Sequence, residues 1–138
     1  MIAFKFSPPR REKEKLRDPI DILLEVVADG RIVVGDRELV AIEALPIVEL
    51  AAQLDFWLRR QPNEDFSYES AEADKPLLWF RRMDGQWQVG SDWEGAVAPL
   101  LASDADLLVA AAGYINNVKR EVQKQLGVDI GPALRIRP

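Results

Sequence analysis

Cysteine and histidine are both absent from the 138-residue sequence. Without cysteine the chain has no disulfide framework, no thiolate nucleophile and no thiolate ligand for zinc or an iron–sulfur cluster. Without histidine it has no imidazole metal ligand, and none of its side chains titrates near pH 7 at an ordinary pKa. A serine triad of the usual kind also loses its base. The two absences remove parts that most hydrolases and metalloenzymes need.

Long apolar runs are missing as well. No stretch approaches the roughly 20 apolar residues that span a bilayer. The segment Met1–Arg10 has neither the basic start nor the small-residue cleavage site of a signal peptide. We therefore expect a cytoplasmic protein that does not associate with membranes. Because 48% of the residues are hydrophobic, the chain has enough apolar surface for one core, and we expect residues 1–138 to form a single domain.

Phosphate-binding loops of the G-x-G-x-x-G or G-x-x-x-x-G-K type are absent too. Two carboxylate pairs, Glu64-Asp65 and Asp104-Ala105-Asp106, lack the spacing of a calcium loop. The second pair falls at the expected start of a helix, where acidic residues complement the dipole. We therefore predict a protein that is not an enzyme and that has no cofactor and no metal site. An enzyme built on carboxylates, arginine and tyrosine would need a concave site with converging acids.

Charge is unevenly distributed along the chain. Residues 18–118 hold 19 acidic and 7 basic side chains, a net charge of −12, whereas the two flanks together hold 11 basic and 4 acidic, a net charge of +7. An acidic body disfavours nucleic acid, because phosphate contacts dominate that affinity. It favours a basic protein partner, which it would attract by electrostatic steering. An acidic surface also serves solubility alone, and net charge leaves both interpretations open.

Alternating apolar residues predict several strands. The predicted segments are 2–6, 19–28, 31–34, 38–43 and 66–70. Asp29-Gly30 is predicted to be a two-residue hairpin turn between the second and third strands, because a type I′ turn needs positive φ at both positions. Gly35-Asp36 supplies a further bend.

Apolar residues at helical spacing predict two helices. The first has Pro46 at its first position and is ended by Gln61-Pro62-Asn63. The second runs from a capping Ser103 to Leu126, with Gly127 as its stop. Residues 96–102 are expected to cross to the second helix. The proline- and charge-rich segment 7–17 predicts a mobile loop, with a basic arm as the alternative. Residues 128–138 predict a tail or a short edge segment.

The clearest predicted element is a hairpin around Asp84-Gly85. With these two residues as the loop, Phe80 faces Val89 across the strands. One side of the hairpin then carries core residues, namely Leu78, Phe80, Trp87 and Val89. The other side carries Trp79, Arg81, Gln86 and Gln88. Arg82 is predicted to stack near Trp87.

The order of strands, helix, strands and long helix predicts an α+β fold. We expect an antiparallel sheet built of hairpins, with two main helices packed on one face as a two-layer sandwich. Two helices cover one face of a small sheet and not both, so the Trp79 side should be partly open. Because tryptophan and arginine are over-represented in interface hot spots, we predict partner contacts there. The predicted contacts are Trp79, Arg81 and Gln88, with Asp74, Asp84 and Asp92 around them.

Burial of Trp79 under the charged loop or the first strand is the alternative. The other three tryptophans, Trp57, Trp87 and Trp93, are expected in the core.

The elements between residues 20 and 126 resemble small bacterial immunity proteins of polymorphic and contact-dependent toxin systems, and also several bacterial domains of unassigned function. The resemblance lies in Leu54-Asp55-Phe56-Trp57-Leu58, Phe66-Ser67-Tyr68, Leu77-Leu78-Trp79-Phe80 and the run Trp87–Trp93 before a long closing helix. It implies a stoichiometric inhibitor that binds one cognate toxin in the cytosol, and it assigns no contact residue. The alternative function is an adaptor or regulatory domain without a toxin partner.

Overall fold

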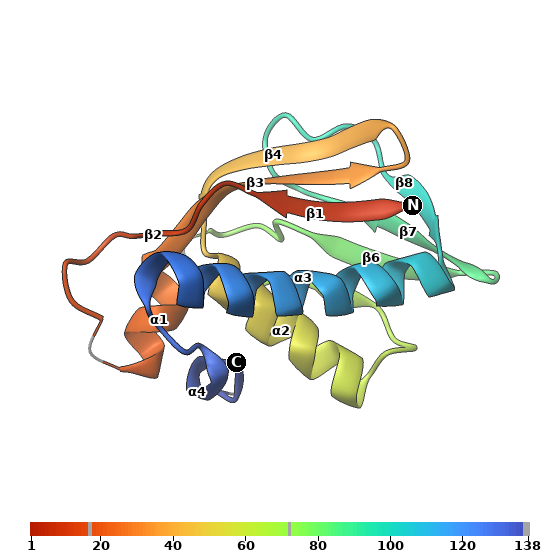
Figure 1. The fold of residues 1–138 in the computed structure, drawn as a ribbon. Helices are drawn as coiled ribbons and strands as arrows, with labels where there is room; N and C mark the ends of the chain where they lie inside the picture. The colour runs from red at the N-terminus through yellow and green to blue at the C-terminus, as the bar shows by residue number, and fades with distance from the viewer. Residues whose placement is uncertain (17, 72, 137–138) are drawn as a thin grey trace.

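The computed structural model describes residues 1–16, 18–71 and 73–136, which form an α+β fold of two antiparallel sheets and four helices (Figure 1). The predicted α+β class is confirmed, and so is its construction from antiparallel strands. The strands divide between two sheets where we expected one. The first sheet uses strands that precede helix α2 (Ile47–Arg60), the second uses strands that follow it, and each group pairs within itself.

The first sheet is centred on strand β3 (Val26–Val34). Strand β1 (Ile2–Phe6) lies antiparallel on one side of it, with Phe4 opposite Ile32, and β4 (Arg37–Leu45) lies on the other side. The two-residue strand β2 (Arg10–Arg11) pairs with the start of β3. Part of the charged segment 7–17 is therefore strand; its mobility stays a prediction.

The expected strand over 19–28 is wrong for its first seven residues. Pro19–Glu25 form helix α1, which begins at Asp18, whose side chain accepts a hydrogen bond from the backbone N–H of Asp21 at 2.9 Å. An aspartate at the N-cap followed by proline is a helix start. This local signal outweighs the β-branched residues that indicated a strand.

The turn expected at Asp29-Gly30 is also wrong. Both residues lie inside β3, at a bulge where the pairing with β4 shifts register. The Asp29 carboxylate accepts a hydrogen bond from the backbone N–H of Ala44 at 3.1 Å, so the bulge is closed by a side chain. The hairpin turns instead at Gly35-Asp36, where Gly35 has a φ of 65°.

The second sheet has the order β5 (Phe66–Ser67), β6 (Trp79–Met83), β7 (Gln86–Gly90), β8 (Leu100–Ser103). The predicted hairpin register is confirmed, with Phe80 opposite Val89. Strand β8 lies in the segment expected to be only a crossover, and it places Leu101 opposite Gln88. Strand β5 is shorter than expected because Glu69 turns to α2, where its backbone bonds to the Gln53 side chain at 2.8 and 3.0 Å.

The two predicted helices, α2 and α3 (Asp104–Leu126), are confirmed. Ser103 accepts a hydrogen bond from the backbone N–H of Asp106 at 3.1 Å, and Gly127 ends α3 with a left-handed φ of 66°. The tail predicted over 128–138 is wrong where the structure describes it. Gly131–Leu134 form helix α4, because Ile130, Ala133 and Leu134 bury their side chains.

A single hydrophobic core joins both sheets to the helices. Helices α2 and α3 lie side by side on one side of the strands (Figure 1). The Trp57 ring of α2 lies 5.3 Å from the Phe80 ring of β6, and Phe80 lies 6.3 Å from Phe4 of β1. The Tyr114 hydroxyl of α3 donates to the Ile47 carbonyl at 2.8 Å. Within the described residues, no helix combines the length and the apolar character needed to cross a membrane.

Replacing Ile115 with alanine should lower the free energy of unfolding by about 2–5 kcal/mol, as large-to-small core substitutions do. Ile115 is buried on the face of α3 that packs against the core. Val109 is the matched control, because it lies on the same helix and is 73% exposed. Val109→Ala should change stability by less than about 0.5 kcal/mol. Urea denaturation measures both, and equal effects would contradict the packing.

Candidate functional site

The outer face of the second sheet, defined here by Arg81, Met83, Gln88 and Leu101, is the side opposite Phe80 and Val89. Arg81, Gln88 and Leu101 stand in one row across β6, β7 and β8. Leu101 is 54% exposed and Met83 is 46% exposed. No element of the described chain covers these two apolar side chains, so this side of the sheet is open.

Trp79 lies on the same side, but its ring is not open. The residue is only 8% exposed. The Arg81 guanidinium carbon lies 4.2 Å from the centre of the ring, and the indole N–H donates to Asp92 at 3.0 Å. The ring lies against Gly90, its cross-strand neighbour, where an added Cβ would collide with it. The expectation of an exposed Trp79 anchor is therefore wrong, because an arginine and a glycine enclose the ring.

The other predicted contacts are accessible to different degrees. Arg81 is exposed and Gln88 is half-buried. The acidic residues Asp74, Asp84 and Asp92 are all exposed. Of these three, the structure shows only Asp92 in contact with Trp79. The role of all these residues in binding stays a prediction.

Sequence reasoning missed Met83, Leu101 and Asp65 on or beside this face, and it misplaced Trp93. Leu101 was missed because β8 was not recognised, although the alternation in Leu100–Ser103 is a strand signal. Asp65 accepts a hydrogen bond from the backbone N–H of Arg82 at 2.8 Å. Trp93, expected in the core, is exposed, because the chain has left the sheet after Gly90 and the pleat no longer directs this side chain inward.

A hollow of about 250 Å³ lies between Trp79 and the edge strand β5. Asp65, Ser67, Arg81 and Asp92 contribute to its lining. Two of its four polar lining side chains are acidic. It continues the outer face toward the edge of the sheet.

Asp104 connects the start of α3 to the second sheet. One carboxylate oxygen accepts hydrogen bonds from the Trp87 indole at 2.8 Å and from the Arg82 guanidinium at 2.9 Å. The Trp87 bond, and then the bond and charge of Arg82, hold the pKa of Asp104 below its ordinary value. The predicted stacking of Arg82 on Trp87 is also present, at 5.0 Å from the ring centre.

A second hollow, of about 510 Å³, lies between α1, α2 and the chain that follows β5. Glu49 of α2 lines it and accepts a hydrogen bond from the Tyr68 hydroxyl at 2.7 Å. Burial raises the pKa of Tyr68 well above its usual value, and the charge of Glu49 adds to that increase. The hydroxyl therefore stays protonated and acts as a donor.

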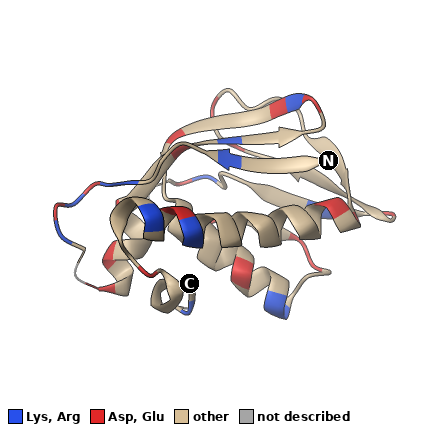
Figure 2. Ribbon diagram, in the orientation of Figure 1, with Lys and Arg blue, Asp and Glu red and all other residues tan. Residues whose placement is uncertain are grey.

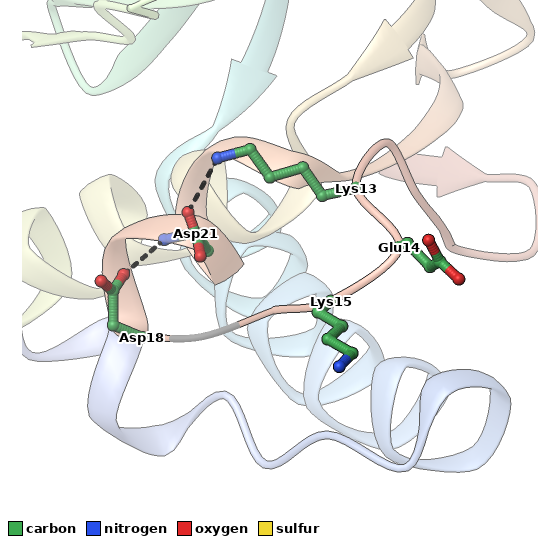
Figure 3. Close-up of a pocket in the computed structure, with 5 residues that line it drawn as sticks. All are labelled: Lys13, Glu14, Lys15, Asp18 and Asp21. Carbon is green, nitrogen blue, oxygen red and sulfur yellow. Dashed lines mark hydrogen bonds and ion pairs between the residues drawn. The ribbon is translucent and has the colours of Figure 1, made fainter.

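A third and wider hollow, of about 700 Å³, lies beside the charged segment before α1. Lys13 reaches Asp21 at 3.1 Å, while Glu14 and Lys15 point away from that pair (Figure 3). The hydrogen bond with Asp21 raises the pKa of Lys13, and the charge of Asp21 raises it further. This amine is held protonated, so it is a poor base and a poor nucleophile. Its positive charge is paired with Asp21 of the same chain.

Acidic residues are concentrated in the part of the chain that builds the second sheet. Residues 61–106 hold 10 acidic and 3 basic side chains. Figure 2 shows basic residues along the segment between β1 and α1 and on the C-terminal half of α3. Among the described residues, no group of three or more aspartates and glutamates is arranged to hold a metal ion.

Gly90→Ala should destabilise the protein by about 1–3 kcal/mol, the usual cost of overpacking. The new methyl group would meet the Trp79 ring. In a Trp79→Ala background most of this cost should disappear, since the colliding ring is gone. Gly113→Ala is the control, because a Cβ at this position in α3 meets nothing within 4 Å. An unchanged cost of Gly90→Ala without the tryptophan would contradict the contact.

Asp104→Asn should destabilise the protein at neutral pH, and the difference from wild type should shrink in acid. The lowered folded-state pKa of Asp104 means that its ionised form stabilises the native state. That contribution is complete above the unfolded pKa of about 4 and is lost as the pH falls through the lower folded pKa. Urea denaturation from about pH 7 to about pH 3 measures it. A pH-independent difference would contradict the role of the charge.

Comparison with known proteins identifies the family and no characterised relative. No curated protein and no solved structure matches the chain. A family model described as a domain of unknown function, DUF7878, matches residues 2–124. That range contains both sheets and nearly all of α3, including every residue of the outer face. The chain belongs to the DUF7878 family.

Proposed function

We propose that this chain is a cytosolic, non-enzymatic protein-binding domain that binds a basic partner through the outer face of its second sheet. One observation carries the proposal. Leu101 and Met83 are 54% and 46% exposed on a strand face that the described chain leaves uncovered. The two residues lie on the same face on either side of β7, with Gln86 and Gln88 between them. Apolar side chains that stay exposed on an uncovered face with polar residues around them are typical of protein interaction sites.

The residues beside them are suited to a rigid interface. Arg81 is stacked on Trp79, and Trp79 is in turn held by Asp92. An arginine fixed in this way loses less conformational entropy on binding than a freely moving one. Arginine is also enriched in interface hot spots. Trp79 thus contributes by positioning Arg81, which replaces the direct contact that we first predicted for it.

The charge of this region favours a basic partner. The excess of acidic residues between 61 and 106 includes the exposed Asp65, Asp84 and Asp92. Complementary charge accelerates association and excludes acidic partners such as nucleic acids. The proposal of no enzymatic activity rests on the missing cysteine and histidine.

Two forms of the proposal remain distinct. In the first the partner is a basic toxin domain and the chain is its immunity protein, a form that rests on the resemblance described above. In the second the chain is an adaptor with a non-toxic partner. Expression of the partner alone separates them. A toxin should arrest growth, and coexpression of this chain should restore it, whereas an adaptor's partner should leave growth unchanged.

Leu101→Asp and Met83→Asp should each weaken binding of the basic partner by at least about tenfold, since burying an unpaired carboxylate in an interface is costly. Val109→Asp on α3 is the matched control, because Val109 is exposed away from this face. Affinity measured by titration calorimetry should also fall with added salt, as screening weakens charge attraction. Wild-type affinity in both sheet variants would refute the outer face as the binding site.

A further inference from the structure

Glu49 is an acidic side chain that is almost entirely buried, with only 7% of its surface exposed. One carboxylate oxygen accepts the Tyr68 hydroxyl at 2.7 Å, and the other accepts the backbone N–H of Ala71 at 3.3 Å. Both partners are neutral donors. The described residues place no lysine or arginine in an ion pair with Glu49. Each oxygen of the Glu49 carboxylate thus has one neutral donor, which leaves further lone pairs open, and no cation within the described residues pairs with it.

This carboxylate lines the hollow of about 510 Å³ described above. Leu23, Ala52 and Ile136, from three parts of the chain, contribute apolar side chains to its wall. Glu69 adds a second carboxylate, and no basic side chain contributes to the described lining. The hollow therefore combines apolar side chains with negative charge, and the part of the chain that the structure describes supplies no cation to it.

The hollow adjoins the proposed interface. Ser67 of the edge strand β5 lines both this hollow and the smaller one beside Trp79 and Arg81. Strand β5 pairs with β6 on one side only. A partner segment that covers the Arg81 side and passes over this edge reaches Glu49 without leaving the surface.

We propose that the Glu49 hollow is a subsite for one cationic side chain, an arginine or a lysine, of the basic partner. This inference rests on the proposed function and gives it a specific recognition element. The aliphatic stem of such a side chain matches the wall formed by Leu23, Ala52 and Ile136, and its charged end matches Glu49 and Glu69. Anionic groups are excluded by repulsion from the two carboxylates.

The energetic reason lies in the unpaired charge. A buried carboxylate strengthens any ion pair it forms, because the surroundings screen the interaction less than water does. The charge-assisted hydrogen bonds of a guanidinium or ammonium group use the lone pairs that Tyr68 and Ala71 leave open. A neutral side chain of the same shape would remove water from the carboxylate without forming an ion pair with it, so it should bind less well.

The probe is butylguanidinium, which carries an alkyl stem and the arginine head group, and its neutral counterpart is butylurea. In a nuclear magnetic resonance titration of the full chain, butylguanidinium should give saturable shifts of the Ala71 amide and of the Gln53 side-chain amide, which line the hollow. Butylurea should give none. Glu49→Gln should weaken the binding at least about tenfold, since one charged partner is lost.

Two further variants keep the test decisive where Glu49→Gln disturbs folding. Ala52→Leu fills the hollow and retains both carboxylates, so it should abolish the saturable shifts. Glu94→Gln, an exposed acid that does not line the hollow, is the control and should bind as wild type does. Equal shifts with butylurea, or cation binding that survives Ala52→Leu, would overturn the subsite.

The titration needs no partner, so its failure is separate from failure of the proposed function. The hollow can fail to bind the cation while Leu101→Asp and Met83→Asp still weaken the partner complex. That combination would overturn the subsite alone. If the cation binds and the two sheet variants leave partner affinity unchanged, the outer face is overturned as the interface, and the partner role of the subsite with it.

Discussion

The packing of aromatic rings around Trp57 is the constraint on which the rest of the structure depends. Trp57 of α2 contacts Phe66, Phe80 and Trp87, with ring centres 5.7, 5.3 and 5.6 Å apart, and Phe80 in turn stacks near Phe4 of the first sheet. Phe66, Phe80 and Trp87 thereby hold the inner side of the second sheet against α2. Every strand residue that alternates with it must point outward, and neither long helix is left to cover that side.

Local signals predicted much of the fold. Asp84-Gly85 determined the β6–β7 register, and with it the side on which Arg81 and Gln88 lie. The limits of α2 and α3 followed from apolar spacing and from Ser103 and Gly127. The wrong predictions concern local sequence signals that are compatible with more than one structure. Asp29-Gly30 has the composition of a turn, yet the Asp29 carboxylate binds Ala44, a partner 15 residues away that no local pattern reveals.

The sequence predicted the side of the sheet on which the candidate site lies, but not the arrangement of its side chains. Pleat parity placed Trp79 opposite Phe80 correctly. The Trp79 ring is enclosed because Gly90 lies across the hairpin and Arg81 stacks on the ring. The alternation of residues along a strand does not predict such side-chain arrangements. Glu49 was hidden for a similar reason. In sequence it is one acid in the first turn of a helix, and only the return of Tyr68 and Ala71 to α2 buries it.

The outer face and the Glu49 hollow would contribute differently to binding. In the proposed function, the outer face would contribute apolar area, which would give affinity but little selectivity, because Leu101 and Met83 would accept many apolar partners. A buried carboxylate selects strongly, because a partner that brings no cation must remove water from the carboxylate and forms no ion pair with it in exchange. In this chain two carboxylates lie beside the sheet edge at β5, Glu49 of α2 and Glu69 after β5. Under the proposed function, discrimination among partners should therefore depend on the position of a single positive charge relative to the partner's contacts with Leu101 and Met83.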